Sequence, residues 1–127
     1  MQLNSVVIID DERLLCTSIQ GILSAAGCEA HAFQAPGDAL DFIAANHCDL
    51  MITDLKMPEM DGLALIEQAR AACPLIRTIL MSAFLNQVDR DLAAFHEVDL
   101  VLEKPVDLDL LISQTNYLLS TPNMARI

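Results

Sequence analysis

The feature that most constrains the fold is a regular alternation of short apolar runs with helical patterns. Apolar runs of strand length occur at residues 6–9, 30–33, 50–53, 76–81 and 98–102. After each run, apolar residues recur at the spacing of a helix that packs on one face. Such strict strand–helix alternation is typical of a parallel sheet covered by helices on both faces and joined by right-handed crossovers.

Signals at the ends of the predicted elements support this pattern. Residues 6–9 are all β-branched, as is typical of a strand buried on both faces. Gly27 stands where the first helix must end, Pro36 suits the first turn of the second helix, and Pro74 closes the third. The last two helices are marked by apolar or small residues at helical spacing: Val88, Leu92 and Phe95, then Leu108, Leu111, Ile112, Thr115 and Leu119.

Two strand orders suit five such units, the Rossmann-like order and the flavodoxin-like order. The glycines, at positions 21, 27, 37 and 62, match neither the dinucleotide-binding nor the P-loop spacing. We therefore predict an α/β, flavodoxin-like fold with a doubly wound, five-stranded parallel sheet. A chain of 127 residues suits a single domain, which we place at 1–120, with 121–127 as a C-terminal tail or the start of a linker.

Charge and composition exclude several classes of partner. With 7 Lys+Arg against 18 Asp+Glu the net charge is −11, so direct binding to nucleic acid or to an anionic membrane surface is disfavoured. The sequence contains neither an apolar stretch of membrane-spanning length nor a signal-peptide pattern. The four cysteines are widely spaced in apolar surroundings, as expected of reduced thiols. We predict a soluble, cytoplasmic protein.

Polar side chains collect at the predicted carboxyl ends of the strands, where open parallel sheets bind ligands. They are Asp10, Asp11, Asp54, Ser82 and Lys104. Singly, each has an ordinary explanation as a helix cap, a turn former or a solvated lysine. Together, three converging carboxylates would repel one another, and one lysine does not neutralise three. A divalent cation with oxygen ligands would, and Mg²⁺ is the usual choice where phosphate is involved.

Four blocks of the sequence carry a family resemblance. They lie at 6–12, 52–62, 80–83 and 102–105, and the second contains the pattern D-x-x-M-P-x-M-D-G. In order and spacing they resemble the receiver domain of bacterial response regulators in two-component signalling, of which the single-domain chemotaxis regulator is the simplest example. The resemblance spans nearly the whole chain. It implies a phosphorylation-dependent signalling switch rather than an enzyme acting on a separate substrate.

The resemblance also implies an acceptor and a metal site. Asp54 would be the phospho-acceptor, taking a phosphoryl group from a phosphohistidine on a sensor histidine kinase or a phosphotransfer protein. Asp11, Asp54 and the backbone carbonyl of Lys56 would bind Mg²⁺, with Asp10 acting directly or through water. Phosphoryl transfer depends mainly on positioning and charge neutralisation, which such a set of groups would supply.

Two further residues receive roles from the resemblance. Ser82 would donate its hydroxyl to a phosphoryl oxygen and move as the switch. Lys104 would pair with Asp54 and then with the phosphoryl group, as a flexible point charge. In the family the bond between Lys104 and Pro105 is usually cis, which the chemistry of X-Pro bonds permits.

The sequence departs from the family pattern on its output side. Val101 stands where the family usually has an aromatic switch residue, and Val106 stands where an aromatic often follows the lysine and proline. We therefore predict that phosphorylation is retained and that the usual serine-to-aromatic relay is altered. Val101, Leu110 and Tyr117 are candidates for a surface on the fourth helix, fifth strand and fifth helix, which would contact a downstream effector or a second copy of the chain. Phe84 is either a packed core aromatic or an influence on the lifetime of the acyl phosphate.

Two other classes of function compete with the switch. The first is a protein-interaction module of the same fold that never uses phosphate; the complete set of site residues argues against it, and Val101 argues for it. The second is an aspartate-nucleophile phosphatase, which needs a second acid two residues after the nucleophile. Lys56 occupies that position after Asp54, so this class is disfavoured.

Overall fold

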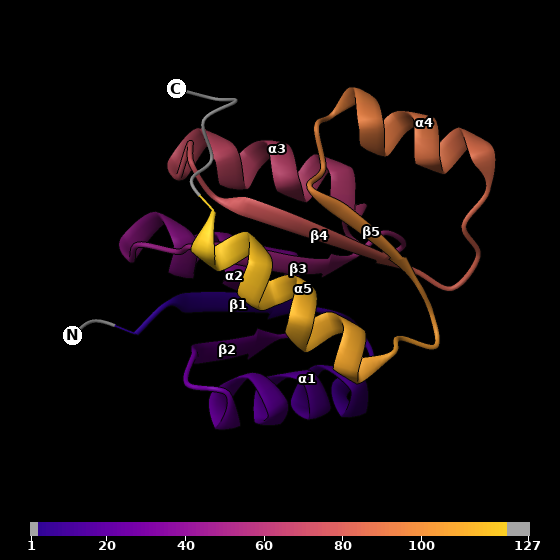
Figure 1. The fold of residues 1–127 in the computed structure, drawn as a ribbon. Coiled ribbons are helices and arrows are strands. Elements are labelled where there is room, and N and C mark those ends of the chain that lie inside the picture. The colour runs from indigo at the N-terminus through magenta and orange to yellow at the C-terminus, as the bar shows by residue number, and fades with distance from the viewer. Residues whose placement is uncertain (1–2, 122–127) are drawn as a thin grey trace.

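The computed structural model describes residues 3–121 and consists of alternating strands and helices (Figure 1). In chain order the elements are β1 (Ser5–Ile9), α1 (Arg13–Ala25), β2 (Glu29–Phe33), α2 (Pro36–Ala45), β3 (Leu50–Asp54), α3 (Gly62–Ala72), β4 (Arg77–Ser82), α4 (Gln87–Phe95), β5 (Leu100–Glu103) and α5 (Leu108–Ser120). The strands form one parallel sheet in the order β2-β1-β3-β4-β5. This is the predicted flavodoxin-like topology.

Helices cover both faces of the sheet. Helices α1 and α5 lie on one face, and α2, α3 and α4 lie on the other (Figure 1). Side chains of β1 alternate between these two cores: Val7 and Ile9 pack under α2 and α3, whereas Val6 and Ile8 pack under α1 and α5. All four are fully buried, as expected for a central strand, and each such side chain stabilises the fold by roughly 1.5–3 kcal/mol.

The predicted elements are all present, with shifted strand ends. Gly27 closes α1 with a φ of 95°, and Pro36 is in the first turn of α2. The fifth strand was predicted to begin at Val98 but begins at Leu100. The reason is that the Val98 N–H donates to the carbonyl of Ala93 (3.0 Å) and so belongs to the end of α4. Of the predicted tail at 121–127, only Thr121 lies within the described residues.

The apolar residues of helix α4 do not form its buried face. Val88, Leu92 and Phe95 do mark a helix, but all three are exposed, Phe95 to 80 %. The buried residues of α4 are Asp89 and Ala93. The expectation of an inward apolar stripe is therefore wrong for this helix, because it packs on the sheet through a short acid and a small side chain.

Two further expectations concern the cysteines and membrane-spanning helices. The four cysteines are free thiols, and three of them are buried. Between residues 3 and 121, none of the helices combines the length and the apolar character that crossing a bilayer requires.

A side chain at Gly62 would collide with the end of β3, which carries Asp54, and with a side chain of β4. An ideal Cβ there would lie 2.4 Å from the backbone oxygen of Asp54 and 2.9 Å from Cδ1 of Leu80. Gly62→Ala is therefore expected to lower the free energy of unfolding by about 2 kcal/mol, because backbone must move to admit the methyl group. Urea denaturation followed by circular dichroism measures this change.

The matched control for this substitution is Gly21→Ala. Gly21 lies inside α1, and nothing lies within 4 Å of its ideal Cβ. Alanine should stabilise the helix there by up to about 1 kcal/mol. If both substitutions shifted stability in the same direction, the close approach of Asp54 and Leu80 to Gly62 would not explain why glycine is needed there.

Candidate functional site

The polar residues predicted from the strand ends lie together at one edge of the sheet. Asp10 directly follows β1, Asp54 ends β3, Ser82 ends β4, and Lys104 directly follows β5. Because all the strands are parallel, their carboxyl ends meet at this edge. Asp10, Asp54 and Ser82 are buried, whereas Asp11 is exposed.

Lys104 is the cation at the centre of the site. Its Nζ lies 2.8 Å from Oδ2 of Asp10, 3.4 Å from Oδ1 of Asp54 and 3.2 Å from Oε1 of Glu12. The lysine therefore pairs most closely with Asp10, in addition to the contact with Asp54 that the family resemblance implies. Glu12 had no predicted role; its position directly after two aspartates was the signal that could have included it.

The charges at this site perturb one another. Burial raises the pKa of Asp10, and the hydrogen bonds from Lys104 and from the Glu12 N–H oppose that rise. Burial, followed by the charge of Asp10, raises the pKa of Asp54. Burial lowers the pKa of Lys104, but the hydrogen bond to Asp10 and the charges of Asp10 and Asp54 outweigh it, so the net shift is upward. The site holds more negative charge than its lysine neutralises.

Three carboxylates at the site are arranged so that a cation could bind. One ligand oxygen from each of Asp10, Asp11 and Asp54 lies within 4.8 Å of the others. Oxygen donors of this kind fit a hard divalent cation such as Mg²⁺ or Ca²⁺. The excess negative charge described above also favours the binding of a cation.

A hollow of about 270 Å³ opens beside Asp54. Its lining includes Lys56, Ser82, Lys104 and, from α4, Asp89. The Ser82 hydroxyl donates to the backbone carbonyl of Phe84 (3.1 Å), so it is engaged by the β4–α4 loop. Phe84 itself is 77 % exposed, which rules out its interpretation as a packed core aromatic.

Asp89 was missed by sequence reasoning. It stands between Val88 and Leu92 in a helical pattern whose apolar side was expected to face the sheet. The buried position of its side chain follows only from how α4 is placed. No signal in the sequence distinguishes it from Asp91 on the same helix.

Backbone hydrogen bonds connect the strand ends around the site. The Leu55 N–H donates to the carbonyl of Met81, and the Lys104 N–H donates to the carbonyl of Ser82, both at 2.8 Å. The peptide bond between Lys104 and Pro105 is cis, as the resemblance led us to expect. The two hydrogen bonds connect the strand ends that carry Asp54, Ser82 and Lys104.

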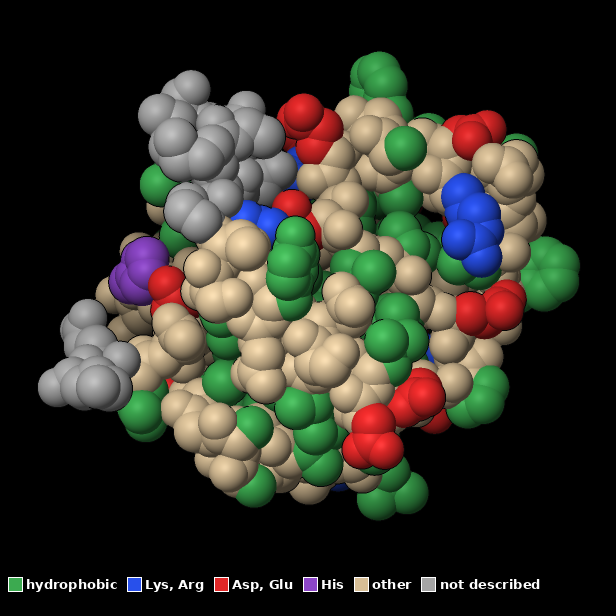
Figure 2. All heavy atoms as spheres, in the orientation of Figure 1, with side chains coloured by type: hydrophobic (Ala, Val, Ile, Leu, Met, Phe, Trp, Pro, Cys, Tyr) green, Lys and Arg blue, Asp and Glu red, His purple; other side chains and the backbone are tan. Residues whose placement is uncertain are grey.

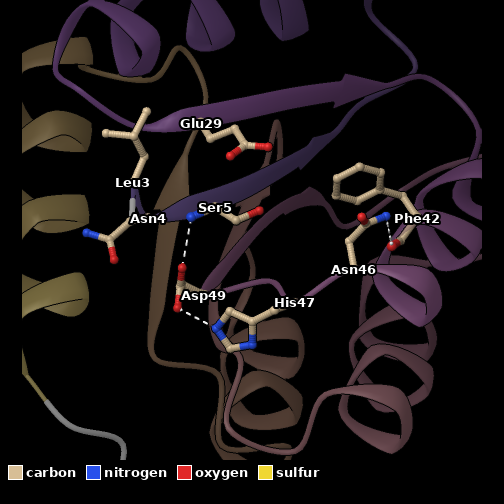
Figure 3. A pocket seen from close by; sticks show the side chains of 8 residues that line it. All are labelled: Leu3, Asn4, Ser5, Glu29, Phe42, Asn46, His47 and Asp49. Atoms are coloured by element: carbon tan, nitrogen blue, oxygen red, sulfur yellow. Dashed lines mark hydrogen bonds and ion pairs between the residues drawn. The ribbon is translucent and has the colours of Figure 1, made fainter. Parts of the chain in front are cut away.

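A second hollow lies at the opposite, amino ends of the strands (Figure 3). There Asp49 accepts a hydrogen bond from the Ser5 N–H and pairs with the ring of His47, both at 2.8 Å. These contacts join the start of β3 to the start of β1. The hollow lies at the opposite end of the strands from the acidic site, and its acid Asp49 is paired with His47 and the Ser5 N–H.

Hydrophobic side chains project from the surface over α4 and along α5 (Figure 2). Leu110 and Tyr117 of α5 are exposed, as predicted. Val101 is half-buried on β5 and packs against the core beneath α2, α3 and α4. The position that usually carries an aromatic switch residue therefore holds a smaller side chain that faces this core.

Comparisons with known proteins agree with this geometry. The family model described as "Response regulator receiver domain" matches residues 6–116. The chain is 30% identical over 110 residues to the DNA-binding transcriptional regulator NtrC of Klebsiella pneumoniae, covering 86% of this chain and 23% of that protein. It is 32% identical over 107 residues to the transcriptional regulatory protein ZraR of Salmonella typhimurium, covering 84% and 24%. The chain thus spans about a quarter of the length of the curated relatives it matches.

Solved structures show the same fold. A CheY-like receiver domain from Methanospirillum hungatei superposes with a TM-score of 0.88 at 24% identity, covering 93% of this chain and 94% of that one. The receiver domain of the Francisella response regulator 1452 gives 0.83 at 25% identity, covering 91% and 96%. The family match, the shared fold and the polar site at the carboxyl edge of the sheet agree with one another. The chain belongs to the response regulator receiver domains, which are the phosphorylation-dependent signalling switches of two-component systems.

Proposed function

We propose that Asp54 is the phosphoryl acceptor of this receiver domain. The observation that supports it is a buried carboxylate that lies 3.4 Å from the Lys104 ammonium and opens onto a hollow. In the transfer, an oxygen of Asp54 attacks the phosphorus of a phosphohistidine. The bond between nitrogen and phosphorus breaks, and the released imidazole takes a proton from solvent. The product is an acyl phosphate on Asp54.

Asp10, Asp11 and Asp54, together with the backbone carbonyl of Lys56, are the groups that would hold Mg²⁺. When bound, the cation neutralises negative charge between the carboxylate and an anionic donor. Lys104 supplies a second positive charge to a phosphoryl oxygen. The chemistry of the domain is limited to its own phosphorylation and dephosphorylation.

Ser82 is proposed to report the phosphoryl group. Its hydroxyl is free to exchange the Phe84 carbonyl for a phosphoryl oxygen, a stronger and charged acceptor. This exchange would release the β4–α4 loop and bias its position. With Val101 in place of an aromatic, the movement would pass through the loop and α4 rather than through a rotating ring.

The phosphodonor is proposed to be a sensor histidine kinase or a phosphotransfer protein. A downstream effector, or a second copy of the chain, would contact the surface of α4, β5 and α5. Exposed apolar side chains on this surface include Val88, Leu92, Phe95, Leu110 and Tyr117. The net charge of −11 argues against direct binding of this domain to nucleic acid.

Intact-mass measurement tests the proposal. After incubation with acetyl phosphate and Mg²⁺, the protein should gain the mass of one phosphoryl group. The gain should disappear when EDTA removes the cation. A folded protein that gained no mass from an efficient donor would favour the interaction module that does not use phosphate.

Two residues at the mouth of the hollow are expected to set the lifetime of the acyl phosphate. Lys56 and Phe84 both line it and stand two residues beyond Asp54 and Ser82. Lys56→Asn and Phe84→Ala should each change the dephosphorylation rate by about threefold or more, because they alter the access and orientation of attacking water. Decay of the phosphorylated mass after donor removal measures the rate. Rates equal to that of the wild type would contradict this role.

A further inference from the structure

Asp89 is a charged side chain in an unusual place. It lies in the first turn of α4 and is 7 % exposed, while apolar neighbours on the same helix face solvent. Charged residues are seldom buried unless they are paired. The inward placement of this acid therefore calls for a physical role.

The carboxylate of Asp89 lacks a donor at its buried oxygen. Its Oδ2 is inaccessible to solvent and has no hydrogen-bond partner among the described residues. The Asp89 N–H donates to Oδ1 of Asn86 (2.8 Å), but this bond caps the helix and leaves Oδ2 without a donor. The positive end of the α4 dipole stabilises a charge at this position only in part.

Asp89 is one of the residues that line the hollow beside Asp54. Lys104, which also lines that hollow, is already engaged by Asp10, Glu12 and Asp54. A phosphoryl group on Asp54 would add a charge of about −1.5 to −2 to the same space. That space is lined by the Lys104 cation, which follows β5, and by the acidic residue Asp89 of α4.

We propose that Asp89 is an electrostatic determinant of the phosphoryl pocket. Its negative charge opposes an anionic group on Asp54 and so limits how readily the domain is phosphorylated. The inference rests on the proposed role of Asp54. Like charges in a partly buried site repel more strongly than in water. Removing the charge without changing the shape should therefore favour both phosphorylation and the binding of phosphoryl analogues.

Three variants test the proposal. Asp89→Asn removes the charge and keeps the shape, whereas Asp89→Glu keeps the charge. Asp91→Asn removes an exposed charge from the same helix, where Asp91 accepts a hydrogen bond from Gln87, and serves as the matched control. Circular dichroism confirms that each variant is folded.

Two measurements are made on each variant with Mg²⁺ present. One is the affinity for the anionic phosphoryl analogue formed from beryllium and fluoride, followed by fluorine NMR. The other is the initial rate of phosphorylation by acetyl phosphate, followed by intact mass. Asp89→Asn should raise both by at least about threefold, while Asp89→Glu and Asp91→Asn should stay close to the wild type.

The outcomes separate the two proposals. If Asp89→Asn matches Asp91→Asn, or if Asp89→Glu behaves like Asp89→Asn, the charge of Asp89 does not control the pocket and the inference is wrong. If the wild type itself takes neither the analogue nor the phosphoryl group, the role of Asp54 is wrong, and the inference about Asp89 is wrong with it.

Discussion

Asp54→Ala is expected to abolish the Mg²⁺-dependent mass gain from acetyl phosphate. The initial rate should fall on the order of a hundredfold or more, because the oxygen that forms the new bond is absent. The neighbouring acids cannot substitute for it. Asp10 is fully buried against Lys104, and Asp11 is exposed outside the hollow that Asp54 lines. Intact mass recorded over time gives the rate directly.

Asp41→Ala is the control for this substitution. Asp41 is an exposed acid on α2, so its removal changes the net charge by the same amount without touching the site. Its mass gain should match that of the wild type. A phosphorylated Asp54→Ala protein would place the acceptor at another residue, which peptide mapping of the modified protein would identify.

Lys104→Met is expected to affect both stability and chemistry. The substitution keeps an unbranched apolar stem of nearly the same length but leaves Asp10 fully buried without its closest cation, which lies 2.8 Å away in the wild type. Without Mg²⁺, the free energy of unfolding at pH 7 should fall by about 3 kcal/mol, the cost typical of breaking one side of a buried pair. Phosphorylation should slow by about tenfold or more, because a positive charge at the phosphoryl group is lost.

The stability deficit of Lys104→Met should depend on pH. Hydrogen bonding and charge from Lys104 oppose the upward shift in the pKa of Asp10, so losing the lysine raises that pKa further. A carboxyl whose pKa is higher in the folded state than in the unfolded state costs stability as pH rises. The deficit should be smallest while Asp10 is protonated in both folded proteins, and it should grow only above the pKa of Asp10 in the folded wild type, which burial already raises from 3.8. It should level off once Asp10 is ionised in the folded state as well.

Urea unfolding across this pH range, with EDTA present, measures the deficit. Lys56→Met is the stability control, because Lys56 is the other lysine of the chain and its side chain is exposed. It should leave the free energy of unfolding within about 0.5 kcal/mol of the wild type at every pH. A pH-independent loss in Lys104→Met would mean that packing of the lysine stem, rather than its charge, stabilises the site.

Much of the site could be predicted because its residues follow strands in a recognisable local order. Asp10, Asp54, Ser82 and Lys104 each stand at or beside the carboxyl end of an apolar run, and parallel strands bring those ends together whatever the details of packing. The strands themselves were recognisable from β-branched and apolar runs. Their ends were less certain, as Val98 illustrates, because a residue next to a strand can complete the previous helix instead.

Helix α4 shows where prediction from sequence ends. Periodicity correctly indicated a helix, since spacing alone records which residues share a face. Which face is buried depends on neighbouring elements, and here Asp89 and Ala93 face the sheet while Val88 and Phe95 face solvent. The same limit concealed the place of Asp89 beside Asp54.

By itself the sequence determined the strand–helix order, the parallel sheet and the identity of the polar groups at its carboxyl edge. These follow from short-range patterns, because hydrophobic spacing and turn residues act within a few positions of one another. The tertiary structure alone decided that Lys104 pairs most closely with Asp10, that Glu12 joins it, and that Asp89 faces the hollow. Coulombic pairing and burial depend on distances between residues far apart in the chain, and only the packed fold sets those distances.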